Sequence, residues 1–589
     1  MNDSSKDIRK RSIIPFHDTL EKAYQHLSFT ERIIFYCLIA ILIITTVISV
    51  FRLNDFLLVD VPVHGGSISE GVVGSPRFIN PLFAITDADR DLTSLIYAGL
   101  LKVDQSGHLI PEMAESYSVS PDGLTYTFIL KNNLTFHDGV PVTADDVEFT
   151  VLKAQGPGLK SPKRANWDSV KTERVGEREI RFILKQPYAP FLQNATMGIL
   201  PKHIWKDVSD EEFALSFFNI EPIGSGPFSI QAVQRNASGI PERYVLVPFA
   251  NYILGKPYIK EMNIVFYTNE DLLISAFKKG DIMSINSITP EKTEGLLDKD
   301  HVLLTAPLSR IFGVFFNQNQ APIFANLSVR EALNQALDKQ AIVSSVLSGF
   351  GVVADGPIPK GFTSKNLGNA STTTDPVALA KQILEKDGWK LNSEGVYEKT
   401  DKKKKSTERL EFSLSTANAP ELKKAAEMVR DSWQKIGVKV DLKVFESGDL
   451  SQNVIRPRKY DALLFGEIVG RDLDLFAFWH SSQRNDPGLN IALYTNTKTD
   501  KLLADARTIP DENERIDKYL QFEAELKKDV GAIFLYSPTF IYFIPTSIHG
   551  IAINDVTVPS ERFASVEHWY MQTEKIWKIF MSNRKQSND

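Results

Sequence analysis

The chain contains residue combinations that resemble parts of hydrolytic sites, and each one is incomplete. Ser225 lies in Ile-Gly-Ser-Gly-Pro, which lacks the first glycine of a nucleophile elbow and has a proline typical of a tight turn. His137-Asp138-Gly139 follows a strand-like stretch, 124–134, and is also typical of a turn. The ten histidines form no His-Glu-x-x-His pair, and there is no phosphate-binding loop that ends in Gly-Lys-Ser/Thr. The sequence therefore predicts no catalytic residue, metal site or cofactor, and no enzyme.

Composition narrows the remaining classes of function. The 589 residues are 43% hydrophobic and 24% charged, as in ordinary globular proteins, and their number predicts several domains or lobes. The formal net charge of -6 provides no overall positive field for nucleic acid. The single cysteine excludes an internal disulfide framework and a cysteine-rich metal site.

An apolar stretch near the N-terminus, residues 33–51, carries no charged residue over 19 positions. As a helix it spans roughly 28 Å, close to the bilayer hydrocarbon core of about 30 Å. Ser28 and Glu31 before it have capping-box spacing. Between the stretch and Arg77, the only lysine or arginine is Arg52. Six lysines and arginines precede the stretch: Lys6, Arg9, Lys10, Arg11, Lys22 and Arg32. We therefore expect a single-pass protein of the plasma membrane. The positive-inside rule predicts that residues 1–32 lie in the cytoplasm and residues 52–589 outside it.

Other interpretations of the stretch are a buried core helix and a cleaved signal peptide. A core helix is rarely apolar on every face, and the sequence Ser-Val-Phe-Arg (49–52) offers no small-residue cleavage site. Cys37 follows bulky Phe35 and Tyr36, where a lipid-acceptor cysteine would follow small residues. We therefore expect an uncleaved anchor, followed by a tether at 52–64. Upstream of the anchor, four apolar residues recur at helical spacing: Phe16, Leu20, Tyr24 and Leu27. They are compatible with an amphipathic helix at the membrane interface and with a short juxtamembrane turn.

After the tether, strand-like and helix-like segments alternate to the end, which predicts an α/β architecture. Helices are expected at 143–153, with Thr143 and Asp146 as a capping box, and at 420–436. A third begins at Ser328 and breaks at Asp338, which can cap a following turn. The basic run 399–405 has two interpretations, a docking patch for anions and the tip of a hairpin between 395–399 and 410–414. Its short length and alternating flanks favour the hairpin.

A long series of motifs resembles one protein family. The most specific match is 111–153, which includes an Asp-Gly turn, the Phe-His-Asp-Gly turn and a Thr-Ala-Asp-Asp-Val helix start. Other matches follow in family order: Gly65–Ile68, Asn80–Leu82, Gly224–Phe228, Asn251–Tyr252, Gly255–Tyr258, Phe277–Ile282, Phe316–Asn317, Val329–Leu333 and Asp375–Trp389. Together these segments resemble family 5 of the bacterial extracytoplasmic solute-binding proteins, the oligopeptide, dipeptide and nickel receptors of ABC importers. The resemblance covers roughly residues 62–570.

The resemblance implies a two-lobed periplasmic-binding-protein-like α/β fold of type II, with an extra inserted domain. The inserted domain would be 101–215. The first lobe would comprise 65–100, 216–306 and 541–580, and the second lobe 307–540. The chain would cross between lobes near Leu308–Asn317 and Phe540–Pro545. A ligand favours closure of such lobes only if it binds the closed state better than the open one.

In that family much of the recognition surface lies in a second-lobe segment, here 465–480. Peptide-binding members have Trp-x-x-Asp-Tyr-x-Asp-Pro in this segment, and the first Asp pairs with the peptide ammonium. In this chain Glu467 stands at the Trp position, Gly470 at the first Asp and Asp474 near the later Asp. Because a buried ammonium without a carboxylate costs several kcal/mol, this departure leaves peptide binding open. The ligand-binding candidates are Asn80, Asn317, Phe465, Glu467, Arg471, Asp472 and Trp479.

Several residues of this segment also have a structural interpretation. Asp472 and Asp474 could cap the turn that follows them, and Trp479 could be a core residue. Arg471 is either a solvated loop residue or a bidentate clamp for a ligand carboxylate. Glu467 or Asp472 could replace the missing aspartate.

The resemblance implies a receptor that captures a peptide or other small solute for an ABC importer. Its permease and ATPase subunits would be separate chains, and it would contact the bilayer through residues 33–51. An alternative from another class is a tethered sensor or interaction protein with the same fold and no transport. A hydrolase would need a nucleophile and base that the sequence does not provide.

Overall fold

The computed structural model describes residues 28–359, 375–401 and 406–580 and divides into two units. The smaller unit combines Met1–Val63 with Thr573–Asp589, and the larger one is His64–Gln572. The segment with Phe16, Leu20, Tyr24 and Leu27 lies outside the described residues.

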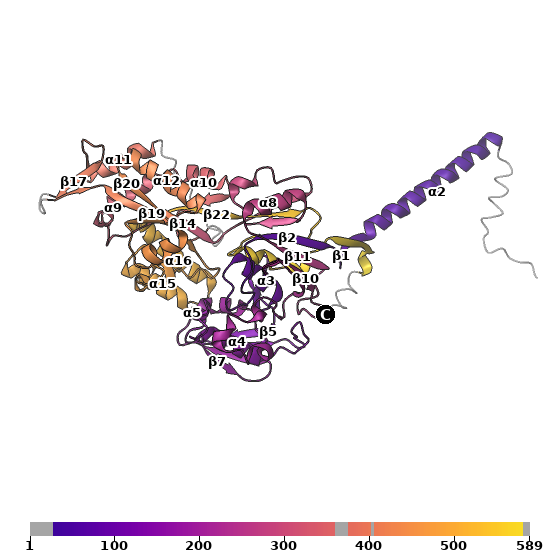
Figure 1. Cartoon of the computed structure of the whole chain (residues 1–589). Helices are drawn as coiled ribbons and strands as arrows, with labels where there is room; N and C mark the ends of the chain where they lie inside the picture. Colours follow the sequence, from indigo (N-terminus) through magenta and orange to yellow (C-terminus); the bar gives the residue numbers. More distant parts are fainter. Residues whose placement is uncertain (1–27, 360–374, 402–405, 581–589) are drawn as a thin grey trace, which may run out of the picture. The chain divides into compact units, whose positions relative to one another are not determined.

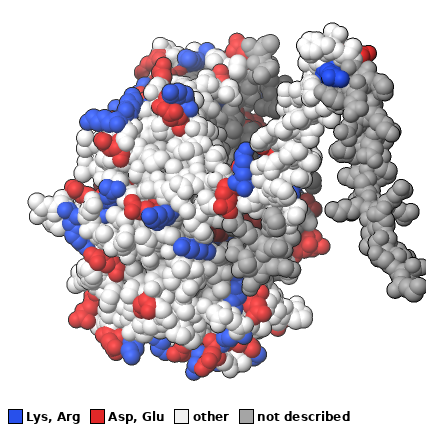
Figure 2. Space-filling view, turned by 90° about the vertical axis from the view of Figure 1, so that its right-hand side faces the viewer, with Lys and Arg blue, Asp and Glu red and all other residues white. Residues whose placement is uncertain are grey.

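The smaller unit is built on one long helix, α2 (Phe29–Leu57), drawn in indigo in Figure 1. The predicted capping box is confirmed, since the backbone N–H of Ser28 donates to Glu31 Oε2 at 2.8 Å. The helix is longer at both ends than the predicted 33–51, and among the described residues it alone is long and apolar enough to cross a membrane. Its charged side chains lie near its ends, and the middle of the helix is uncharged in Figure 2.

The prediction of a tether at 52–64 is wrong for most of that segment. Residues 52–57 continue α2, and β1 (Leu58–Val63) pairs with the C-terminal strand β23 (Gln572–Trp577). The alternation Val59, Val61 and Val63 favours a strand here. At the last residue of β23, Trp577 Nε1 donates to Asn54 Oδ1 at 3.1 Å. The C-terminal strand therefore contacts the end of the apolar helix and the strand after it.

The larger unit is organised around β22 (Ala532–Pro545), which belongs to two half-sheets. Residues 532–536 pair with β14 (Arg310–Phe316), and residues 539–545 pair with β13 (His301–Pro307). The chain thus passes between half-sheets at 308–309 and again near 537–538, slightly before the expected 540–545. The first half-sheet contains β2 (Ser67–Val73), β9 (Phe228–Arg235), β10 (Pro241–Pro248), β11 (Glu261–Tyr267), β12 (Ser284–Asn286) and β13; the second contains β14, β15 (Gly351–Val353), β19 (Glu411–Ala417), β20 (Lys439–Phe445) and β21 (Ala462–Ile468).

The second half-sheet is covered on both faces because its side chains alternate. Val314 and Phe316 of β14 join one core, whereas Ile311 and Phe315 join the other. The first core lies under α9 (Leu327–Gln335), α10 (Lys339–Leu347), α11 (Pro376–Lys386) and α12 (Pro420–Lys435); the second lies under α15 (Thr497–Thr508) and α16 (Glu512–Asp529) (Figure 1). Two helical layers therefore enclose this half-sheet, as in other buried α/β sheets.

Most helices in this region begin and end close to the predicted positions. Helix α12 covers nearly the expected range, and Asp338 caps α10 as predicted. Helix α9 begins earlier than expected, because Asn326 and not Ser328 accepts the capping hydrogen bond. The hairpin interpretation is confirmed by β17 (Tyr397–Asp401) and β18 (Ser406–Arg409), although the returning strand precedes the expected 410–414.

Residues 101–215 form a small sheet with β5 (Ala114–Val119), β6 (Thr125–Leu130), β7 (Lys171–Arg174) and β8 (Glu179–Ile183). Helix α4 (Ala144–Gln155) packs against it, and its capping box is confirmed by a 2.9 Å bond from the Thr143 N–H to Asp146 Oδ2. The sheet shares one apolar core with the first half-sheet. The turn interpretation of His137-Asp138-Gly139 is confirmed, because the Gly139 N–H donates to Phe136 O at 2.9 Å.

The tight turn around Ser225 lies against the end of helix α3 (Asp87–Ile96). A side chain at Gly224 would come within 2.0 Å of Ile96 O, so only glycine fits there. The N–H of Gly226 donates to Ile96 O at 2.8 Å. This close contact fixes the C-terminus of α3 and the following residue, Tyr97.

Candidate functional site

Arg471 lies in the loop after β21, and its side chain forms ion pairs with residues near the C-terminal end of the larger unit. Its Nη2 lies 2.7 Å from Glu561 Oε2 and its Nη1 lies 3.3 Å from Asp555 Oδ2. Its side chain is only 9% exposed, so the solvated interpretation is wrong. The guanidinium therefore binds carboxylates of residues 541–580, expected in the first lobe, from a loop expected in the second.

Asp474 makes a contact between the expected second lobe and the expected inserted domain. Arg507 of α15 reaches Asp474 Oδ2 at 2.6 Å, and the Tyr188 hydroxyl donates to the same oxygen at 3.1 Å. The Arg507 guanidinium also lies 5.3 Å from the centroid of the Tyr188 ring. Because Tyr188 belongs to the segment 101–215, this cluster connects that segment to the second half-sheet.

Asp472 occupies the space beside Gly470. A Cβ at Gly470 would come within 2.7 Å of Asp472 Oδ1, so the Asp472 carboxylate lies where a residue-470 side chain would project. Burial, and after it the negative charge of Asp474, raise the pKa of Asp472 to about 6. The carboxylate is consequently a strong acceptor for a cation that reaches it.

Glu467 and Trp479 point into the apolar core of the second half-sheet. Glu467 is 3% exposed, and its carboxylate accepts no hydrogen bond from the described residues. Burial raises its pKa well above the usual value, and the nearby Trp479 indole only partly opposes this. Trp479 is fully buried among Phe315, Phe522 and Phe534, and Phe465 packs against the same core. Trp479 thus matches the core interpretation.

Asn80 and Asn317 are fixed by contacts within the protein. Asn80 Nδ2 donates to Asn219 Oδ1 at 3.0 Å, and its Oδ1 accepts from the Leu82 N–H. Asn317 Nδ2 donates to Arg458 O at 2.8 Å, and its Oδ1 accepts backbone N–H groups of the following turn. Both side chains are buried and organise turns.

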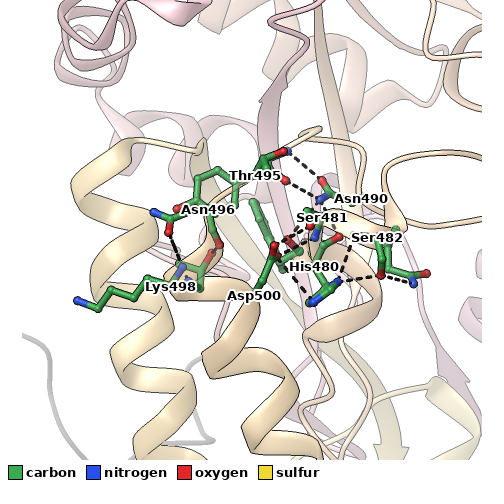
Figure 3. A network of polar contacts seen from close by, with 12 residues as sticks. His480, Ser481, Ser482, Asn490, Thr495, Asn496, Lys498 and Asp500 are labelled. Atoms are coloured by element: carbon green, nitrogen blue, oxygen red, sulfur yellow. Dashed lines mark hydrogen bonds and ion pairs between the residues drawn. The ribbon is translucent and has the colours of Figure 1, made fainter.

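A polar network holds the chain that follows Trp479 (Figure 3). Asp500 accepts from the Ser481 N–H at 2.8 Å and from its hydroxyl at 2.6 Å. His480 Nδ1 lies 2.8 Å from Ser482 Oγ, and its Nε2 lies 3.9 Å from Asp500. Although serine, histidine and aspartate meet here, the aspartate bonds the serine and not the imidazole. The network therefore fixes a turn and lacks the relay of a hydrolase.

Two cavities that the sequence did not predict lie between α3, η1 (Ala189–Thr196) and η7 (Pro559–Phe563), with volumes of about 360 and 240 Å³. Both are lined by Tyr97, Gln193 and Glu561. Tyr97 is 5% exposed and its hydroxyl has no hydrogen-bond partner among the described residues. The volume of the larger one is in the range of small-molecule sites. Its wall residues are far apart in sequence, so no local motif revealed them.

No group of three or more histidine, cysteine, aspartate or glutamate side chains in the described part of the chain could hold a metal ion.

Comparison with known proteins identifies the family. The profile of the bacterial extracellular solute-binding proteins, family 5, matches residues 108–488. The oligopeptide-binding protein AppA of Bacillus subtilis is 29% identical over 522 residues, which cover 87% of this chain and 92% of that protein. The nickel-binding periplasmic protein of Escherichia coli is 28% identical over 64% of this chain and 72% of its own length.

Solved structures agree with this result. AppA of Bacillus subtilis in complex with a nonapeptide superposes with a TM-score of 0.68 at 27% identity, over 87% of this chain and all of AppA (100%). The ABC transporter substrate-binding protein CtaP of Listeria monocytogenes superposes with a TM-score of 0.72 at 26% identity, over 86% of this chain and 99% of CtaP. The two-lobed fold predicted from the sequence is confirmed. The expectation that the protein is no enzyme is confirmed as well, because the family consists of solute-binding proteins. The chain belongs to family 5 of the bacterial extracellular solute-binding proteins.

Proposed function

We propose that this protein is a membrane-anchored receptor that captures a peptide-like solute between its lobes and delivers it to an ABC importer. The observation that carries the proposal is the bridge from Arg471 to Glu561, because Glu561 also lines both cavities. A solute in these cavities would therefore lie beside the bridge between the expected lobes. The peptide relatives named above support the class of solute, and permease and ATPase would be separate chains.

Asp472 is the proposed acceptor for the ammonium group of the solute. Its carboxylate fills the space beside Gly470, the position of the ammonium-binding aspartate in the resembling motif. A buried ammonium needs such a charge, because without one its desolvation costs several kcal/mol. Glu467, the other candidate replacement, points into an apolar core and is a weaker choice.

The test uses the full-length protein in lipid nanodiscs. Native mass spectrometry of protein purified from its host should show a bound peptide, and calorimetry with that peptide should give an affinity that Asp472→Asn weakens at least about tenfold. Asp517→Asn, on α16, serves as a charge-matched control. A bound non-peptide solute, or equal affinities of the Asp472→Asn variant and wild type, would argue against this function.

Helix α2 is proposed as an uncleaved anchor. Its 29 residues would span about 43 Å at about 1.5 Å per residue, more than a bilayer core requires. Intact-mass analysis of the membrane fraction should therefore retain residues 1–57, and a shorter mature chain would show that the helix is a signal sequence. Stimulation of the partner ATPase by the loaded receptor would separate transport from the sensor alternative.

A further inference from the structure

The outer end of α2 reaches beyond the bilayer core. The uncharged stretch 33–51 spans roughly 28 Å, which fills a hydrocarbon core of about 30 Å. The helix continues to Leu57, so residues 52–57 extend about 9 Å further. On each side of the core, the headgroup layer is roughly 5–8 Å thick. The last turn of α2 therefore lies in that layer when the helix spans the bilayer.

The end of β23 is held at the same level. This strand, yellow in Figure 1, pairs with β1, which directly follows α2. The Trp577 indole N–H donates to Asn54 Oδ1 at 3.1 Å, and Lys578 Nζ lies 5.0 Å from the centroid of the Phe56 ring. Both contacts are made to the last turn of α2, so residues 577–578 lie in the headgroup layer as well.

Large apolar side chains are exposed in this part of the molecule. Five of them have exposed fractions between 43% and 71%: Phe51, Leu53, Phe56, Trp577 and Ile579. The contrast is sharpest for tryptophan. The chain has seven tryptophans, all of them among the described residues, and the six besides Trp577 are at most 2% exposed. Trp577 is therefore the tryptophan that an external partner can reach.

The side chains at this level indicate the kind of partner. A tryptophan ring is apolar and carries a polar N–H, which suits the boundary between acyl chains and headgroups. An electrostatic contact with anionic lipid would instead need a cluster of cations. Residues 52–63 and 573–579 together hold three cations, Arg52, Lys575 and Lys578, and three acids, Asp55, Asp60 and Glu574. The surface therefore fits the apolar boundary of a phospholipid layer and not an anionic headgroup.

We infer that Trp577, together with Phe56 and Ile579, inserts into the extracytoplasmic headgroup layer and forms a second membrane contact beside the helix. The inference rests on the proposed function, because it requires α2 to remain as an anchor, and it adds a lipid-binding surface. The larger unit, His64–Gln572, is then attached to the membrane at both of its chain ends, through β1 and β23. The connection is a hydrogen-bonded strand pair and not a single flexible linker.

The experiment measures how far lipid quenches tryptophan fluorescence. Full-length protein is placed in phosphatidylcholine nanodiscs with or without bromine atoms on the acyl carbons nearest the headgroup. Bromine should quench the wild-type emission, and Trp577→Phe should remove most of that quenching, because the other six tryptophans are buried. Trp433→Phe, in the core of the second half-sheet, is the matched control and should keep the wild-type quenching. Replacing part of the phosphatidylcholine by phosphatidylglycerol should also leave the quenching unchanged.

A second pair of variants tests the surface around Trp577. Ile579→Ser removes exposed apolar area, so the quenching of Trp577 by bromine should fall at least about twofold. Lys575→Gln, on β23, changes a charge and removes little apolar surface. It should leave the quenching as in wild type.

Intact-mass analysis of the same sample separates this inference from the proposed function. A chain that lacks residues 1–57 overturns both. A chain that keeps them, with equal bromine quenching in wild type and Trp577→Phe, overturns the inference alone. So does Trp577 emission that aqueous acrylamide quenches and bromine does not, since the side chain then lies in water. Quenching that requires phosphatidylglycerol would show an electrostatic contact in place of the inferred apolar one.

Discussion

Two groups of charged residues in the larger unit contain arginines, and they differ in how deeply the arginines are buried and how completely they are paired. Arg562 binds Asp91 through two bonds of 2.8 and 2.6 Å and Glu70 at 3.1 Å, and it is fully buried. Glu70 in turn accepts from Ser284, Asn286 and Tyr542. Arg90 has one carboxylate, that of Asp87, at 3.9 Å, and neither Lys163 nor Arg310 forms an ion pair with a residue that the structure describes. We interpret the saturated network as structural and expect the incompletely paired cations to tolerate substitution.

Arg471 is intermediate between these two groups. It binds two carboxylates, as Arg562 does, but its partners keep 19% and 29% of their side-chain surface exposed. It also spans the expected lobes, whereas Arg562, Glu70 and Asp91 all lie within the expected first lobe. Arg471 is therefore suited to a contact that forms and breaks as the lobes move.

The strongest test of the comparison is Arg562→Met. It leaves Glu70 and Asp91 buried without their cation, which costs about 3–5 kcal/mol of unfolding free energy. Urea unfolding of full-length protein in detergent, followed by tryptophan fluorescence, should show a large fall in midpoint. Arg90→Gln is the matched control and should change stability by less than about 0.5 kcal/mol. Similar losses in both variants would remove the distinction between the two groups.

Arg471→Met should mainly affect ligand affinity. Removing the guanidinium weakens the contact between lobes and leaves Glu561 and Asp555 unpaired, which we expect to cost about 2–3 kcal/mol in the closed state. Affinity for the bound peptide should fall roughly 30- to 150-fold. Calorimetry measures the affinity, and small-angle scattering should show a larger radius of gyration with ligand than in wild type. An unchanged affinity would show that the bridge does not favour closure.

The pH dependence of Asp472 gives a smaller effect. Folding raises the pKa of Asp472 from 3.8 to about 6. Between about pH 4 and about pH 6, the folded protein therefore holds a proton on this carboxyl that the unfolded chain has lost. Stability from this group therefore falls as pH rises from about 4 to about 6 and stays lower above that range. Asp472→Asn should be more stable than wild type at pH 7, and the difference should vanish near pH 4. Equal stability curves in urea unfolding would contradict this assignment.

The sequence predicted those parts of the molecule that depend on local pattern. Capping boxes at Ser28 and Thr143 and the apolar face of α12 follow from spacing along one helix, and the structure has all three. The strand pairing of β1 with β23 was missed because its partners lie at opposite ends of the chain.

In the candidate site, too, the sequence predicted local features and missed contacts between distant segments. The loop 470–474 was identified from a linear motif, but the partners of Arg471 lie far along the chain, so its pairing could not be predicted. Asn80, Asn317 and Trp479 were chosen by their place in matched segments, and their bonds and burial became visible only once the fold was known. The two cavities beside α3 are lined by distant segments and have no linear motif.

The smallest expected effect comes from Lys424, which pairs with Glu291 and links the expected lobes at the surface. Its side chain is 41% exposed and that of Glu291 is 51% exposed, so water screens the pair. Lys424→Gln should change unfolding free energy by less than about 1 kcal/mol and leave peptide affinity within about twofold of wild type. Urea unfolding measures the first quantity, as for Arg562→Met, and calorimetry measures the second, as for Arg471→Met. A loss of affinity as large as that of Arg471→Met would show that any contact between lobes controls closure, whether its charges are buried or exposed.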